Sequence, residues 1–142
     1  MKTSQAGQDE FVNQLLVIGD NLRKGTFLDI GCGHPIDINN TYELEQIGWR
    51  GLMMDVDAPS VKFARQYRKC DVVCADATTF VYPPRFKSVD YLSLDVDEAQ
   101  EAAMRNLINQ DVRFRVATIE HASYLYGNAP RDELRALLNA AG

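Results

Sequence analysis

Acidic residues and glycines recur at the ends of short apolar runs along this chain. The first run ends in an acid followed by a Gly-x-Gly pattern, and later runs also end in an acid. Carboxylates accept hydrogen bonds from ribose hydroxyls and from an adenine amino group, and glycines let a backbone turn tightly against a ligand. The residues that carry this pattern are Asp29, Gly31, Gly33, Asp55, Asp76 and Asp95. Their order predicts a nucleoside-binding site.

Two of these acids have predicted roles that follow from their positions. Asp55 comes about twenty residues after the glycines, where an acid can hydrogen-bond two ribose hydroxyls. Asp76 follows the next apolar run, where it can accept from an adenine amino group. Asp55 could instead be a solvated loop residue, and the glycines could form an ordinary strand-to-loop turn. The repetition of acids after successive runs favours the binding site over these alternatives.

Such a site needs a scaffold that brings the ends of several strands together. Short apolar runs alternate with helix-like segments, which predicts β-α-β units around a parallel sheet. Strands are expected at 26–30, 52–54, 71–74, 89–94 and 112–119. We predict an α/β fold, with a Rossmann-like, doubly wound, mostly parallel sheet and helices on both faces. The ligand site then lies at the carboxyl ends of the strands.

Local patterns predict where some helices begin and which face they bury. Apolar residues at helical spacing predict an N-terminal helix that faces the core with Phe11, Leu15, Ile18 and Leu22. Asn40 and Glu43 have the spacing of a capping box, which predicts the start of a helix that ends at Gly48. A last helix is expected from about residue 130, because Pro is tolerated in a first turn.

The ordered acids and glycines resemble the successive motifs of class I methyltransferases, which use S-adenosylmethionine (SAM). A finer resemblance, to the FkbM-like methyltransferases, rests on SQAGQD at 4–9, NTYELEQIGWRG at 40–51, YLSLDVD at 91–97, IEH at 119–121 and RDELRALL at 131–138. The chain departs from these families where Pro35 replaces a common third glycine. It also departs after the fourth strand, where DVDEAQ at 95–100 replaces Asp-x-Glu-Gly-x-Glu.

The resemblance implies a SAM cofactor and methyl transfer to an oxygen, often on a sugar or polyketide hydroxyl. It implies that Asp55 holds the ribose, that Asp76 and Ala77 hold the adenine, and that the glycines approach the methionine part. The expected cofactor-binding residues are Asp29, Gly31, Cys32, Gly33, Asp55, Val56, Asp76, Ala77 and Asp95.

Methyl transfer to a hydroxyl needs a proton acceptor near the strand ends. His121 follows the fifth predicted strand and is one candidate base, since a histidine titrates near neutral pH. Asp95 is the other predicted catalytic residue, and His121 could instead be a structural histidine. Asp95, Asp97, Glu120 and His121 could also converge on Mg²⁺, which favours oxygen ligands. Their spacing fits polar pocket walls equally well, so we expect no metal site.

Composition limits the class of protein. The 142 residues suit a single methyltransferase domain, 1–142, which is short at its C-terminus because class I folds usually add two more strands. A formal net charge of −5 disfavours a nucleic-acid partner. We expect neither a signal peptide nor a membrane span, and the three cysteines are expected to be reduced in the cytoplasm. An uncovered fifth strand predicts a homodimer.

The expected acceptor is a small-molecule or sugar hydroxyl, and two alternatives stay open. The first is a cofactor-binding module that is inactive or needs a partner, because the chain ends early. The second is a nicotinamide dehydrogenase, which is disfavoured because Ile36 occupies the place of the last glycine in Gly-x-Gly-x-x-Gly.

Overall fold

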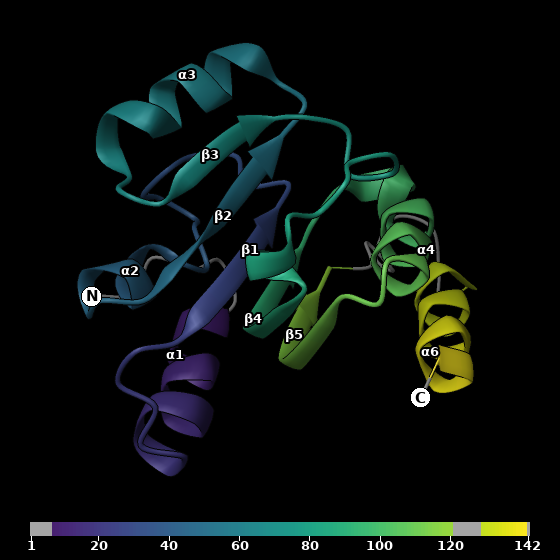
Figure 1. Ribbon diagram of the computed structural model, residues 1–142, viewed down its shortest axis with the longest axis horizontal. Coiled ribbons are helices and arrows are strands. Elements are labelled where there is room, and N and C mark those ends of the chain that lie inside the picture. The colour runs from purple at the N-terminus through teal and green to yellow at the C-terminus, as the bar shows by residue number, and fades with distance from the viewer. Residues whose placement is uncertain (1–6, 121–128, 142) are drawn as a thin grey trace.

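The computed structural model describes residues 7–120 and 129–141, which form an α/β fold around one sheet (Figure 1). Its strands are Thr26–Ile30 (β1), Arg50–Asp55 (β2), Asp71–Cys74 (β3), Ser88–Leu94 (β4) and Arg113–Ile119 (β5). The strand order is β3-β2-β1-β4-β5, and every pairing is parallel. The structure therefore confirms the predicted doubly wound sheet, with β3 and β5 at the edges of its described part.

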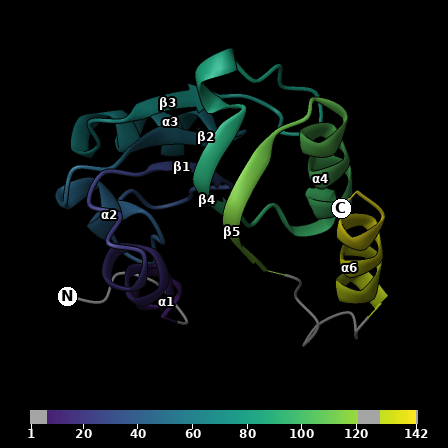
Figure 2. The ribbon, with the colours of Figure 1, turned by 60° about the horizontal axis from the view of Figure 1, so that its bottom comes forward.

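Both faces of the sheet are covered, because successive side chains of a strand point to opposite faces. Leu28 and Ile30 of β1 pack in one hydrophobic cluster with α4 (Gln100–Asn109) and α6 (Ala129–Ala141). Phe27 belongs to a second cluster on the opposite face, with residues of the N-terminal helices and α3 (Ala58–Tyr67). Figure 2 shows α4 and α6 on one side of the sheet and α1 and α2 on the other. These helices fix the strands whose ends form the site.

The N-terminal helix turns a different face to the core from the one predicted. α1 (Gln8–Val12) continues as a π-helical segment, η1 (Asn13–Gly19). Val12 and Leu16 are buried. Of the predicted core residues, Leu22 packs half-buried against the same cluster, whereas Phe11, Leu15 and Ile18 are 53%, 44% and 61% exposed. The prediction was wrong for these three residues because the segment has apolar residues on two adjacent faces. The wider turns of a π-helix also shift the helical spacing on which the prediction relied.

The predicted capping box at Asn40 and Glu43 is also absent. α2 (Tyr42–Gln46) has Thr41 at its N-cap, and no side chain caps it. Asn40 instead donates from Nδ2 to the Ser93 hydroxyl of β4, at 3.0 Å. The helix begins later than predicted because Asn40 and Thr41 are used in contacts with the sheet and the loop after β1.

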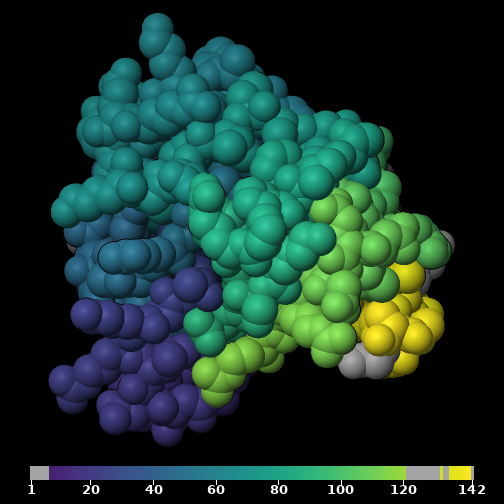
Figure 3. Space-filling model, viewed as in Figure 1, coloured from purple at the N-terminus to yellow at the C-terminus, as the bar shows by residue number. Residues whose placement is uncertain are grey.

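The last helix begins at Ala129, close to its predicted start at about residue 130. Leu137 and Leu138 of α6 are half-buried against the cluster that contains α4. Figure 3 shows α6, in yellow, against the green surface of the preceding elements. Within the ranges that the structure describes, no helix combines the length and apolarity that crossing a membrane requires.

Candidate cofactor and catalytic site

A cavity of about 370 Å³ lies at the carboxyl ends of the strands. The loops after β1, β2, β3 and β4 all contribute to its wall. The chain reverses its order along the sheet between β1 and β4, and open α/β sheets bind ligands at such a point. The volume falls within the range of about 300–1,000 Å³ that is typical of small-molecule sites.

Most of the predicted cofactor residues meet at this cavity. It is lined by Gly31, Gly33, Asp55, Val56, Asp76, Ala77 and Asp95. The other two predicted residues, Asp29 and Cys32, do not line it, and they are only 3% and 4% exposed. His121 lies outside the described residues, so its role stays a prediction.

The two glycines after β1 shape the cavity in different ways. Gly31 has a φ of +78°, and a Cβ there would overlap the backbone carbonyl oxygen of Asp95. Gly31 therefore lets the loops after β1 and β4 touch each other. Gly33 has a φ of +53° with open space around its Cα, and its N–H donates to Asp55 Oδ2 at 3.1 Å. The open space lies where the resemblance implies that a ligand approaches.

One acid ends β2 and a second lies two residues beyond it, and the structure gives them different roles. Asp57 is the N-cap of α3, where Oδ2 accepts from the Ser60 N–H at 2.9 Å and the Ser60 hydroxyl at 2.6 Å. These hydrogen bonds lower the pKa of Asp57. Asp55 lines the cavity and accepts from the N–H groups of Gly33 and Asp57. Because a carboxylate has about four lone-pair sites, Asp55 can still accept from a ligand.

Asp76 is held in place by the turn that follows β3. Its Oδ1 accepts from the Thr78 N–H at 2.8 Å and from the Thr78 hydroxyl at 2.7 Å. The side-chain hydrogen bond, followed by the backbone one, lowers the pKa of Asp76. Both bonds fall on Oδ1, so Oδ2 stays available as an acceptor at the cavity wall.

Among the acids that line the cavity, Asp95 has a raised pKa. Burial, followed by the nearby Glu120 carboxylate, raises the pKa of Asp95 to about 7, and Asp97 and Asp29 act in the same direction. Glu120 directly follows β5, and its N–H donates to the Leu94 carbonyl of β4 at 3.1 Å. A carboxyl group that titrates near neutral pH can exchange a proton during a reaction.

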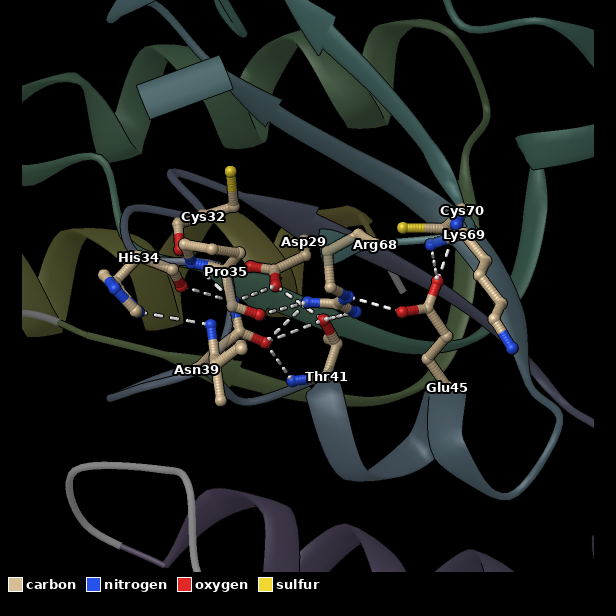
Figure 4. Close-up of polar contacts among 11 residues, drawn as sticks. Asp29, Cys32, His34, Pro35, Asn39, Thr41, Glu45, Arg68, Lys69 and Cys70 are labelled. Carbon is tan, nitrogen blue, oxygen red and sulfur yellow. Dashed lines mark hydrogen bonds and ion pairs between the residues drawn. The ribbon is translucent and has the colours of Figure 1, made fainter. Parts of the chain in front are cut away.

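Asp29 belongs to a buried polar network beside the glycine loop (Figure 4). Its Oδ2 accepts from the Thr41 hydroxyl at 2.7 Å and from Asn39 Nδ2 at 3.3 Å. Burial raises the pKa of Asp29, while the Thr41 hydrogen bond and the Arg68 charge act in the opposite direction. These contacts tie β1 to the segment before α2, so Asp29 can stabilise the loop without reaching the cavity.

Arg68 is the centre of this network, and the sequence did not predict it. Its side chain is fully buried and pairs with Glu45 at 2.6 Å. It also donates to the Pro35 carbonyl at 3.1 Å, to Asn39 Oδ1 at 3.0 Å and to the Thr41 hydroxyl at 3.0 Å. Arg68 follows α3 directly, so the network joins the end of this helix to the loop after β1. No local pattern reveals a pair of residues that meet only in the folded chain.

Asp95, Asp97, Glu120 and His121 are the residues that could converge on Mg²⁺. Within residues 7–120 and 129–141, no group of three or more His, Cys, Asp or Glu side chains is arranged to hold a metal ion. His121, the fourth residue of this set, lies outside the described residues, so the Mg²⁺ alternative stays a hypothesis.

Solved structures share this architecture. A TehB-like SAM-dependent methyltransferase from Corynebacterium glutamicum is 21% identical, with a TM-score of 0.65 over 98% of this chain and 73% of that chain. The fold is that of the class I methyltransferases. The N-methyltransferase NodS from Bradyrhizobium japonicum is 16% identical, with a TM-score of 0.59 over 98% of this chain and 85% of that one.

A third structure was determined with its cofactor. Magnesium protoporphyrin IX methyltransferase from Synechocystis, with bound SAM, is 19% identical, with a TM-score of 0.60 over 96% of this chain and 69% of that one. Likeness at these identities establishes the fold alone. No family model and no curated protein matches the chain, so the FkbM-like resemblance stays a prediction.

Proposed function

We propose that this chain is a SAM-dependent methyltransferase that methylates a hydroxyl on a small molecule or sugar. The observation that supports the cofactor best is the charge of the cavity. Among the described residues, its wall contains Asp55, Asp76, Asp95 and Asp97, and no lysine or arginine.

This charge favours SAM because the molecule carries a sulfonium and an ammonium group against one carboxylate. Two unit charges 4 Å apart interact by about 4 kcal/mol at the effective dielectric constant near a protein surface. The same aspartates would repel the two phosphates of a nicotinamide dinucleotide. A dinucleotide site also needs a helix that begins directly after the glycines. Here α2 begins only at Tyr42, so the loop after β1 offers no helix N-terminus to a pyrophosphate.

Each cavity residue has a role in this proposal. Asp55 accepts hydrogen bonds from the ribose hydroxyls, and Asp76 accepts from the adenine amino group beside Ala77. The backbone at Gly31 and Gly33 faces the methionine part of the cofactor. Asp29 and Cys32, which were also predicted as cofactor residues, are assigned to the support of this loop, because both are buried away from the cavity.

Bound SAM would supply an electrophilic methyl group on a positively charged sulfur. The chain would hold the acceptor oxygen in line with this methyl group, and such positioning supplies much of the rate enhancement in group transfer. Asp95 lines the cavity at the end of a central strand and titrates near neutral pH, which suits it to remove the hydroxyl proton. His121 is retained as a second candidate base.

A thermal-shift comparison of SAM, S-adenosylhomocysteine and NAD tests the cofactor. We expect the two SAM-type ligands to raise the melting temperature and NAD to leave it unchanged, because only a ligand that binds the folded chain stabilises it. Stabilisation by NAD alone would overturn the proposal. Once binding is established, turnover with hydroxylated acceptors distinguishes an enzyme from a cofactor-binding module without activity.

A further inference from the structure

Asp95 and Glu120 are neighbours at the ends of two adjacent strands. β4 and β5 are parallel, and Leu94 is paired with Ile119, so Asp95 and Glu120 are the next residues on each strand. The Glu120 N–H donates to the Leu94 carbonyl, which continues the ladder by one step. Residues opposite each other in a sheet direct their side chains to the same face. Burial, the Glu120 charge and a hydrogen bond with the Glu120 side chain are the three largest causes that raise the pKa of Asp95.

A hydrogen bond between two carboxyl groups requires a proton on one of them, because an ionised carboxylate can only accept. The charged groups that act on Asp95 from around it are Glu120 from the end of β5, Asp97 from the loop after β4 and Asp29 from β1. All three are acids, and no lysine or arginine in the described part of the chain lines the cavity to offset them. Like charges this close favour the retention of one proton, and burial of Asp95 acts in the same direction.

We propose that Asp95 and Glu120 share one proton in the free protein, and that the pair releases it when a cationic cofactor occupies the cavity. The shared proton is the first half of this inference. The release of the proton on cofactor binding is the second half, and it rests on the proposed function. A positive charge beside the pair favours its fully ionised form, as any opposite charge within about 4–6 Å does. Loading of the cofactor thus prepares the base that the reaction needs.

The proton returns to the pair during methyl transfer. With SAM bound, the acceptor oxygen would form a bond to the methyl carbon, and the carbon–sulfur bond would break with its electron pair left on sulfur. The hydroxyl proton passes to the Asp95 carboxylate, which shares it again with Glu120. Asp95 is the proton acceptor in this scheme, and Glu120 is a positioning residue that raises its proton affinity.

The first half can be tested on the free protein by NMR titration of the carboxyl carbons. In the wild type, Asp95 should titrate with a midpoint near pH 7. In Glu120→Gln the repelling charge is gone, and the new amide can donate to the ionised Asp95, so the midpoint should fall by at least one pH unit. Glu98→Gln is the matched control, because it removes the charge of an exposed acid in the same region, η3 (Asp97–Ala99). An Asp95 midpoint near 4 in the wild type would refute the shared proton.

The second half can be tested by calorimetry of SAM binding at pH 6.5 in buffers of different ionisation enthalpy. A group with a pKa near 7 is about three-quarters protonated at that pH. We expect the wild type and Glu98→Gln to release about half a proton or more per SAM bound. S-adenosylhomocysteine, which lacks the sulfonium charge, should release less. Glu120→Gln should bind SAM with little proton release.

The two hypotheses fail in different ways. If SAM binds and the wild type releases no more protons than Glu120→Gln, the cofactor-linked release is wrong and the proposed function stands. If SAM does not bind the folded chain, the proposed function fails together with the linked release. The titration of the free protein decides the shared proton in either case.

Discussion

Replacing Arg68 with methionine should destabilise the fold strongly, because it removes the only positive charge in the described part of the buried network. The Arg68 and Glu45 side chains are 0% and 5% exposed. Removal of one partner from a buried ion pair costs about 3–5 kcal/mol, since the other charge remains buried without compensation. Glu45 keeps the N–H groups of Lys69 and Cys70 as donors, which places the expected cost near the lower end of this range.

The free energy of unfolding can be measured by urea denaturation, with the fluorescence of the single tryptophan, Trp49, as the probe, because this side chain is buried. Arg85→Met is the matched control. Arg85 pairs with Asp71 at 2.7 Å, but the two side chains are 66% and 55% exposed. Exposed pairs contribute about 0–1 kcal/mol, so this control should lose less than about 1 kcal/mol.

A double variant separates the ion pair from the rest of the network. Arg68→Met combined with Glu45→Gln removes both charges, and the glutamine oxygen can still accept from the backbone of residues 69 and 70. The double variant should therefore be more stable than Arg68→Met alone, by at least about 1 kcal/mol. The reasoning is refuted if Arg68→Met costs no more than Arg85→Met, or if the second substitution destabilises the chain further.

Three more predictions follow from the strand ends and the surface. Asp95 binds its proton up to about pH 7 in the folded chain and only to about pH 4 when unfolded. The folded state thus holds more protons in this window, and the free energy of unfolding should fall as pH rises through it. In Glu120→Gln, the free energy of unfolding should decrease less between pH 5 and pH 8, as measured by urea denaturation at each pH. An equal decrease in the variant and the wild type would contradict the effect of Glu120 on the pKa of Asp95. The edge strand β5 and the exposed apolar side chains of α1 and η1 predict self-association, which light scattering would disprove by showing only a 16.0 kDa monomer at micromolar concentrations. If His121 is the base, His121→Ala should lower turnover by about 10²–10⁴-fold with cofactor affinity unchanged, whereas near wild-type turnover would leave Asp95 in that role.

The sheet and the position of the cavity could be predicted from the sequence because their signals are local. Each buried parallel strand reads as a short apolar run, and the acids at 55, 76 and 95 stand directly at the carboxyl ends of such runs. Once parallel strands are assumed, these ends must lie along one edge of the sheet. The cavity is found at that edge.

The features that the sequence did not predict depend on contacts between distant residues. The apolar residues of the N-terminal helix allow two buried faces, and packing against the sheet selects Val12 and Leu16. Asp29 has the sequence context of a ligand-binding acid, but its carboxylate points into a network that exists only after Arg68 has been brought to it by α3. The pairing of Asp95 with Glu120 likewise requires β4 and β5 to be adjacent.

Calorimetric titration of SAM into the wild type and Asp55→Ala tests the central claim most directly. Asp55 lines the cavity, and the proposal assigns it to the cofactor ribose. Loss of a hydrogen bond to a charged group costs about 1.5–3 kcal/mol, so the affinity of the folded variant should be roughly ten-fold lower or more. Glu98→Gln, which removes an acid outside the cavity wall, should bind SAM as the wild type does. Equal affinity of Asp55→Ala and the wild type, or no binding of SAM to either folded protein, would contradict the assignment of this cavity to SAM.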